Sequence, residues 1–201
     1  MVTSSALGIM ERTFSVITPT ILRPSLIETC ESIDRQSYHR WQHIVMVDIP
    51  IADIPDEKLT LIDRIKHPNR LIRYCEVAHK NVGNTCKSRA FKYVCGDYLL
   101  YLDDDDSYLG EVFEILNGQI KDEVWGVFPI ERFGEIFFNF PPRMCHTCSN
   151  QFFYKPLYPH PDNDNYCADG ELIDLLRERH PYLVINSTPL ARVTKQGMGL
   201  Y

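Results

Sequence analysis

The sequence predicts an α/β domain with a mainly parallel central sheet flanked by helices. Short β-rich apolar runs alternate with segments whose apolar residues recur at helical spacing through the first hundred residues. Because a right-handed crossover brings each strand back beside the one before it, this alternation builds a parallel sheet. The fourth run, Tyr98 to Leu102, is almost continuously apolar, which is typical of a strand buried on both faces.

The elements of the first half can be assigned in order from their apolar spacing and their turn residues. A helix is expected to open at Pro24-Ser25, a second carries Leu59, Ile62 and Ile65, and a third covers 85–94, with Gly96 near a C-cap position. The strands expected around these helices span 14–17, 43–47, 71–74 and 98–102.

The pattern changes after Gly110. Residues 124–130 and 135–140 are expected to form strands, and 168–179 an amphipathic helix. We expect a lead at 1–12 and one domain over 13–201, with a smaller mixed sheet in its second half.

Composition and charge exclude several classes of protein. The chain of 201 residues has a formal net charge of -6, which disfavours a nucleic-acid binder because phosphate neutralisation needs a concentrated basic face. No run of eighteen apolar residues and no signal-peptide pattern occurs. The seven cysteines are an odd number, spread through hydrophobic segments, and fit a reducing compartment. We therefore expect a soluble cytoplasmic protein, either free or peripheral to a membrane.

An acidic run, Asp103 to Asp106, directly follows the fourth expected strand. In open α/β sheets ligands bind outside the carboxyl ends of the strands. Four adjacent carboxylates repel one another unless a cation or hydrogen-bond donors neutralise them, and Mg²⁺ or Mn²⁺ prefers such oxygen ligands. The alternative is a solvated acidic turn that caps the next helix.

The order of these motifs resembles glycosyltransferase family 2 over roughly residues 14 to 194. A strand ends at Thr18-Pro19-Thr20, a helix ends in Ser32-Ile33-Asp34-Arg35-Gln36-Ser37-Tyr38, and Gly96-Asp97-Tyr98 precedes the acidic run. The resemblance implies a GT-A (Rossmann-like) fold. It also implies a nucleotide-sugar-binding half at 13–107 and an acceptor-binding half at 108–201.

Residue roles follow from the resemblance by position. It implies that Asp105 binds Mn²⁺ or Mg²⁺ directly and that Asp103 and Asp104 support the metal or contact the nucleoside. Lys87 falls near the donor diphosphate, where a lysine acts as a point charge; a surface lysine is the plainer alternative. The other residues expected to contact the donor nucleotide are Thr18, Pro19, Thr20 and Asp48.

One departure from the family concerns the nucleotide base. The family usually follows its second strand with two acidic residues, and here the segment reads Val47-Asp48-Ile49-Pro50. Since Ile49 offers no side-chain acceptor to a base, GDP and dTDP remain alternatives to UDP, which is favoured.

The resemblance also implies a catalytic base at the start of the last helix. Asp169 occupies that position, although Ala168 replaces the family's first acid. Asp169 could equally be a helix N-cap, a role compatible with catalysis. Other acids, histidines, aromatic residues and a C-terminal lid could contribute to the site: Asp162, Asp164, Glu171, His160, His146, Trp125, Phe137, Phe138, Tyr158 and 194–197.

The function expected from this sequence is metal-dependent, inverting transfer of a sugar from a nucleotide-diphosphate sugar to a hydroxyl acceptor. The acceptor could be a glycan, a lipid-linked sugar or a protein-linked group. Two alternatives stay open, namely a nucleotidyltransferase and a catalytically degenerate scaffold that binds carbohydrate or protein. The Cys145-His146-Thr147-Cys148 motif could be half of a zinc site or a redox pair, but incidental thiols explain it more simply.

Overall fold

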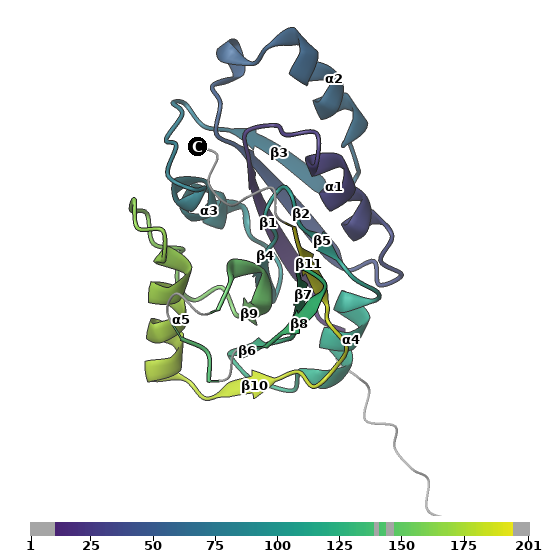
Figure 1. The fold of residues 1–201 in the computed structure, drawn as a ribbon, viewed down its shortest axis with the longest axis vertical. Coiled ribbons are helices and arrows are strands. Elements are labelled where there is room, and N and C mark those ends of the chain that lie inside the picture. The colour runs from purple at the N-terminus through teal and green to yellow at the C-terminus, as the bar shows by residue number, and fades with distance from the viewer. Residues whose placement is uncertain (1–10, 139–140, 144–146, 195–201) are drawn as a thin grey trace, which may run out of the picture.

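A seven-stranded sheet forms the centre of the protein (Figure 1). The structure is a computed structural model that describes residues 11–138, 141–143 and 147–194. The strand order is β10-β6-β9-β4-β1-β2-β3, and β4, β1, β2 and β3 run parallel, as predicted. Their bounds are β1 Phe14–Thr20, β2 Trp41–Val47, β3 Arg70–Tyr74, β4 Tyr98–Tyr101, β6 Trp125–Val127, β9 Phe152–Tyr154 and β10 Tyr182–Val184.

A smaller mixed sheet packs beside the carboxyl end of the large one, in the order β5-β11-β7-β8. Its strands β11 and β7 are parallel, and the other two pairings are antiparallel. All four of these strands lie after residue 106, in the second half of the chain, as expected for the mixed-sheet region. The bounds are β5 Ser107–Tyr108, β7 Ile130–Arg132, β8 Glu135–Phe137 and β11 Ala191–Val193.

Helices cover both faces of the large sheet. Alternate residues of β1 point to opposite faces, so that Val16 packs in a core shared with α4 and Ile17 in a core shared with α3 and α5. None of the helices in the described ranges is long and apolar enough to cross a membrane. The helices are α1 Leu26–Asp34, α2 Asp56–Arg64, α3 Asn84–Ala90, α4 Val112–Gln119 and α5 Ala168–Arg179, with 3₁₀ turns η1 Ile51–Asp53, η2 Phe91–Tyr93 and η3 Ser149–Gln151.

The structure differs from the sequence prediction at several boundaries. Strand β1 continues through Thr20, because 18–20 pair in register with the end of β2. The single strand expected at 124–130 is two strands in different sheets, separated at Pro129, which has no N–H to donate to a ladder. The bounds of α5 match the prediction.

Gly96 is not a helix cap, because α3 ends at Ala90 and a 3₁₀ turn follows. The Gly96 backbone instead packs directly against β1, and a Cβ atom added to this residue would lie 2.6 Å from the Ser15 main-chain nitrogen. This close approach is what requires glycine at position 96.

Two glycine substitutions should therefore have opposite effects on stability. Gly96→Ala should lower the free energy of unfolding by about 1–3 kcal/mol, since the new methyl group collides with backbone. Gly118→Ala in α4 meets nothing within 4 Å and should raise it by about 0.5–1 kcal/mol, as alanine favours the helix. Denaturant unfolding of both variants measures the difference, and a stabilised Gly96→Ala protein would contradict the packing described for β1.

Candidate active site

A cleft of about 590 Å³ opens at the carboxyl ends of β1 and β4 and reaches the start of α5. The acidic run forms one wall of this cleft, and Lys87 and Asp169 line it as well. The structure thus brings together residues more than sixty positions apart in the sequence. Each of the four aspartates in the run has a different environment.

Asp104 is held by the loop after β1. Its two oxygens accept hydrogen bonds from Thr20 Oγ1 (2.6 Å) and Arg23 Nη1 (3.1 Å). Burial raises the pKa of Asp104, while Thr20 and Arg23 act in the opposite direction. This carboxylate therefore joins the acidic run to the end of β1.

Asp105 differs from its neighbours in the run in the hydrogen bonding of one carboxylate oxygen. Its Oδ2 atom is buried and has no hydrogen-bond partner among the described residues, and the nearest cation, Arg23 Nη1, is 3.8 Å away. Burial, followed by the charges of Asp103 and Asp104, raises the pKa of Asp105 to about 6. A buried carboxylate oxygen without a hydrogen-bond donor, on a residue that lines the cleft, suits a hard divalent cation, so Mn²⁺ or Mg²⁺ fits this wall.

Asp106 has a structural role. It accepts hydrogen bonds from the Asn150 side chain and from the Thr194 main-chain nitrogen (2.9 Å). Burial and then Asp103 raise its pKa to about 9. The hydrogen bond from Thr194 acts in the opposite direction, because a donor favours the ionised carboxylate.

Asp103 is the most accessible member of the run, with 38% of its side chain exposed. Its Oδ1 lies 3.4 Å from Lys87 Nζ, and its Oδ2 accepts a hydrogen bond from Ser149 Oγ at 3.3 Å. Asp103 therefore faces the cleft while the protein orients it from two sides.

Lys87 links the acidic run to Asp169. Its buried ammonium lies 3.3 Å from Asp169 Oδ1, in addition to its contact with Asp103, and stands over the Tyr101 ring at 5.5 Å. Burial alone would lower the pKa of Lys87, but Asp103 and Asp169 raise it well above its usual range. Lys87 is therefore a permanent cation inside the cleft and not an exposed surface lysine.

Asp169 lies in the first turn of α5, where His160 holds it. His160 Nε2 is 2.6 Å from Asp169 Oδ1, and His160 Nδ1 faces the Pro161 carbonyl at 2.9 Å. Although burial opposes ionisation, Lys87 and His160 hold the pKa of Asp169 well below its usual range. Helix α5 begins at Ala168 with Cys167 at its N-cap position, so Asp169 lies inside the first turn and is not the N-cap residue.

Helix α3 positions Lys87 and also anchors the loop before α5. Gly83 precedes the helix with a φ of +82°, and an added Cβ would lie 2.7 Å from the Pro19 side chain. The Asn84 amide donates to the carbonyl oxygens of Asn163 and Asn165, both at 2.9 Å. These contacts set the distance between Lys87 and the helix that carries Asp169.

The remaining residues expected to contact the donor lie at different depths. Pro19 lines the cleft, and Thr20 reaches it through Asp104. Thr18 is buried in the sheet with its hydroxyl 2.9 Å from His43 Nε2, and it is not among the cleft-lining residues. The Asp48 carboxylate accepts hydrogen bonds from the main-chain nitrogens of His79 and Lys80; it does not line the cleft but borders a small adjoining hollow with Pro19 and Asp104.

The other acids named from the sequence do not line the cleft. Asp162 accepts a hydrogen bond from the Thr85 hydroxyl, Glu171 accepts from Asn163 and Asn165, and Asp164 lies in an exposed loop. Among the acids proposed as the base, Asp169 alone lines the cleft.

The aromatic residues divide in a similar way. Phe137 lines the cleft, whereas Trp125 is fully buried and donates to the His180 carbonyl. Phe138 and Tyr158 pack against the core beneath α5. Of the expected lid, Thr194 contacts Asp105 and Asp106, while 195–197 lie outside the described residues, as do Cys145 and His146.

The cysteines are not all thiols. Cys167, directly before α5, is disulfide-bonded, whereas five others are free: Cys30, Cys75, Cys86, Cys95 and Cys148. The prediction of incidental thiols concerned Cys145 and Cys148, of which Cys148 is a free thiol.

Several residues of the site were not selected from the sequence. Arg23 neutralises Asp104 and Asp105, and Ser149 and Asn150 hold Asp103 and Asp106 from a 3₁₀ turn. Arg23 follows a strand-ending turn, which is a position that could have drawn attention to it. Ser149 and Asn150 lie more than forty residues from the acidic run, and no spacing pattern marks them.

The mainly parallel sheet, the acidic run after β4 and the acid on α5 are the features expected from the resemblance to glycosyltransferase family 2. The family model described as glycosyl transferase family 2 matches residues 15–175, and the chain belongs to that family.

Solved structures show the same fold. TarS residues 1–349 from S. aureus in complex with UDP-GlcNAc superposes with a TM-score of 0.71 at 16% identity, over 92% of this chain and 59% of that one. The mannosyltransferase PcManGT from Pyrobaculum calidifontis, in complex with GDP-Man and Mn²⁺, gives 0.65 at 15% identity over 93% and 59%. This chain thus spans about three fifths of these chains. No curated protein matches it significantly in sequence.

Proposed function

We propose that this protein transfers a sugar from a nucleotide-diphosphate sugar to a hydroxyl acceptor, with inversion and with Mn²⁺ or Mg²⁺. UDP is the favoured nucleotide. The observation that carries the proposal is the placement of Lys87 between Asp103 and Asp169, at 3.4 and 3.3 Å, beside the unpartnered oxygen of Asp105. One cleft thereby contains groups for a cation, for a diphosphate and for a proton transfer.

The donor half of the site is proposed at the acidic run, within residues 13–107. Asp105 and Asp103 would hold the divalent cation, which when bound stabilises charge on the leaving diphosphate. Arg23 and Lys87 add positive charge on either side of the run. Pro19 and Thr20 border the nucleotide, while Thr18 and Asp48 support that wall from within the fold.

Asp169 is proposed as the base that takes the proton from the acceptor hydroxyl. In the structure Lys87 and His160 keep it ionised, which makes it available but weakly basic. A donor diphosphate that attracts Lys87 would remove one of these two contacts. The basicity of Asp169 would then rise only when the donor is in place, which couples proton removal to donor binding.

The acceptor is proposed to approach from residues 108–201, where α5 and the mixed sheet line the cleft. Phe137 and the exposed Tyr166 offer aromatic faces there, which suit sugar rings. Glycan, lipid-linked and protein-linked hydroxyls all match this chemistry. The net charge of -6 argues against nucleic acid as a partner.

At the two positions where the chain departs from the family pattern, the residues are apolar and pack inside the fold. Ile49 packs with the cluster beneath α1 and α2, and Ala168 is fully buried at the start of α5. An ionised acid at either position would lose its hydration without a described cation beside it. The absence of these two acids is therefore compatible with an active site built on Asp105 and Asp169.

Cation binding should depend on pH through Asp105. A carboxyl group with a pKa of about 6 is mostly protonated at pH 5, and only the ionised form binds the cation. The affinity for Mn²⁺ should therefore be about tenfold lower at pH 5 than at pH 7.5. Calorimetric titration of Mn²⁺ across this range checks the prediction, and an affinity that stays constant from pH 5 to 7.5 would contradict it.

The proposed activity can be tested by screening sugars linked to UDP, GDP and dTDP for release of the nucleoside diphosphate, with and without Mn²⁺. NMR of the product then shows whether the anomeric configuration is inverted. Metal-dependent release from one nucleotide class supports the proposal, and a retained configuration would refute the single-displacement route. If no nucleotide binds to the folded protein, the chain is a degenerate scaffold that acts as a binding module.

A further inference from the structure

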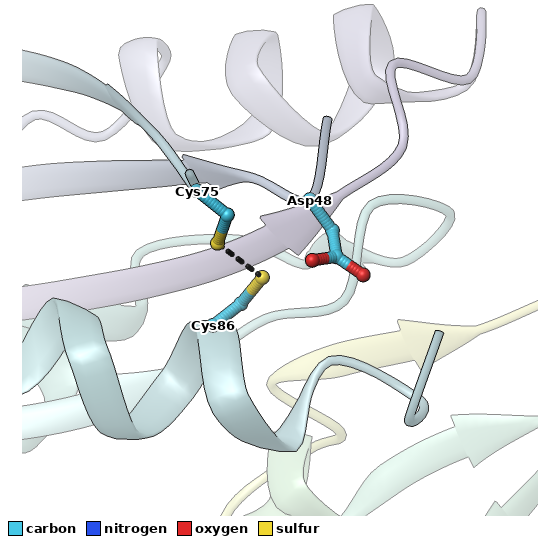
Figure 2. A group of neighbouring side chains, drawn as sticks. All are labelled: Asp48, Cys75 and Cys86. Atoms are coloured by element: carbon cyan, nitrogen blue, oxygen red, sulfur yellow. Dashed lines mark hydrogen bonds between the residues drawn. The ribbon is translucent and has the colours of Figure 1, made fainter. Parts of the chain in front are cut away.

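A second cluster of potential ligands lies outside the cleft. It comprises Asp48 at the end of β2, Cys75 after β3 and Cys86 in the first turn of α3 (Figure 2). One ligand atom from each residue lies within 4.8 Å of the others, and all three residues are buried. The cluster joins three separate elements beside the wall of the donor site.

The distance between the two sulfur atoms fits a tetrahedral metal. Cys75 Sγ and Cys86 Sγ are 3.6 Å apart. Two sulfurs bound at about 2.3 Å to a tetrahedral Zn²⁺ lie about 3.8 Å apart. Figure 2 shows the two sulfur atoms facing each other and one oxygen of the Asp48 carboxylate on their side. Small side-chain adjustments would therefore complete three of four ligand positions.

The carboxylate is already oriented for such a role. Asp48 accepts hydrogen bonds from the His79 and Lys80 main-chain nitrogens at 3.0 and 2.9 Å, and its Oδ1 lies 2.8 Å from His79 Nδ1. Both carboxylate oxygens already have two polar contacts, since Oδ2 also lies 3.1 Å from the His79 main-chain nitrogen, so a bound metal would take the place of one of them. A carboxylate ligand held by a histidine and by backbone is the outer-shell arrangement that orients metal ligands.

The cluster also has chemistry and access suited to a soft ion. Both sulfur atoms belong to free, buried cysteines, and cysteine sulfur is a ligand that Zn²⁺ prefers. A hollow of about 10 Å³, enough for about one water molecule, borders Asp48 and Cys86 and lies against Thr20 and Gly83. A fourth, water ligand can occupy this space.

We propose that Asp48, Cys75 and Cys86 form a structural site for Zn²⁺, separate from the cation site of the acidic run. The ion ties the ends of β2 and β3 to α3, and Cys86 immediately precedes Lys87 in that helix. The site stands independently of the proposed transfer activity, because its two thiolates select a softer ion than the oxygen ligands of Asp103 and Asp105.

Cobalt substitution tests the proposal, since sulfur ligands give Co²⁺ a charge-transfer band in the near ultraviolet that carboxylates do not. The reduced, metal-free protein should show this band at one equivalent of Co²⁺. The band should disappear in Cys75→Ser and Cys86→Ser, weaken in Asp48→Asn, and persist in the controls Cys30→Ser and Asp105→Asn. Circular dichroism establishes that each variant is folded.

A measurement on the wild-type protein avoids dependence on the variants. Zinc X-ray absorption of the protein loaded with one equivalent should show two sulfur neighbours at about 2.3 Å. An environment of oxygen and nitrogen alone, or a Co²⁺ band that survives both serine substitutions, would overturn the proposal. A thiol count showing that Cys75 and Cys86 join in a disulfide under the assay's reducing conditions would overturn it as well.

Discussion

Asp105→Asn should lower the affinity for a nucleoside diphosphate in the presence of Mn²⁺ by about 100-fold. The substitution keeps the size of the side chain but removes the charge of the one carboxylate oxygen in the run that is buried without a hydrogen-bond partner in the described structure. The loss of one direct ligand and of its charge corresponds to about 2.7 kcal/mol. Calorimetry with saturating Mn²⁺ measures the effect.

The matched control for this variant is Asp63→Asn, which removes the same charge from a side chain that is 71% exposed and far along α2. It should bind the nucleotide as the wild type does. The same affinity in Asp105→Asn and Asp63→Asn would show that Asp105 is not a cation ligand.

Asp169→Asn should reduce turnover by about 10³-fold while the donor affinity changes little. An amide cannot accept the proton of the acceptor hydroxyl, and general-base catalysis contributes about 10² to 10⁴ in rate. The acidic run is unaltered in this variant, so the donor contacts remain. Steady-state kinetics, with calorimetry of donor binding, separate the two effects.

Glu171→Gln serves as the control because it lies in the same turn of α5 and interacts with the loop residues Asn163 and Asn165 outside the cleft. Its turnover should stay within a few fold of wild type. A tenfold or smaller loss in Asp169→Asn, or an equal loss in Glu171→Gln, would point to a structural role for this part of the helix.

The parallel half of the fold was accessible from the sequence because its strands are buried on both faces. Such strands read as uninterrupted apolar runs, and turn residues mark their ends, as at Tyr98 to Leu102. The amphipathic helix α5 was predicted with its correct bounds because its apolar residues recur at helical spacing. The family resemblance added the roles of Asp105 and Asp169.

The second half was harder to predict because its strands are only two or three residues long. Strands β6 and β7 are separated by Phe128-Pro129 and enter different sheets, a choice that depends on tertiary pairing and not on local pattern. Gly96 shows the same limit, since a helix cap and a close backbone contact both call for glycine.

The polar network around the acidic run was likewise inaccessible to spacing arguments. Four adjacent aspartates look alike in the sequence, yet Thr20, Asn150 and Thr194 give them separate roles. Burial and the neighbouring carboxylates raise the pKa of Asp106 to about 9 and that of Asp105 to about 6. Only the folded structure distinguishes the aspartate that is internally satisfied from the one that is available to a cation.

The central claim is that the acidic run forms a cation-dependent site for a nucleoside diphosphate. Its most direct test is calorimetric titration of UDP into the wild-type protein, first with Mn²⁺ and then after chelation, with GDP and dTDP in parallel. We expect one nucleotide, most strongly UDP, to bind with Mn²⁺ and to lose that binding when the cation is removed. Binding that is unaffected by chelation, or the absence of binding of all three to the folded protein, would contradict the claim.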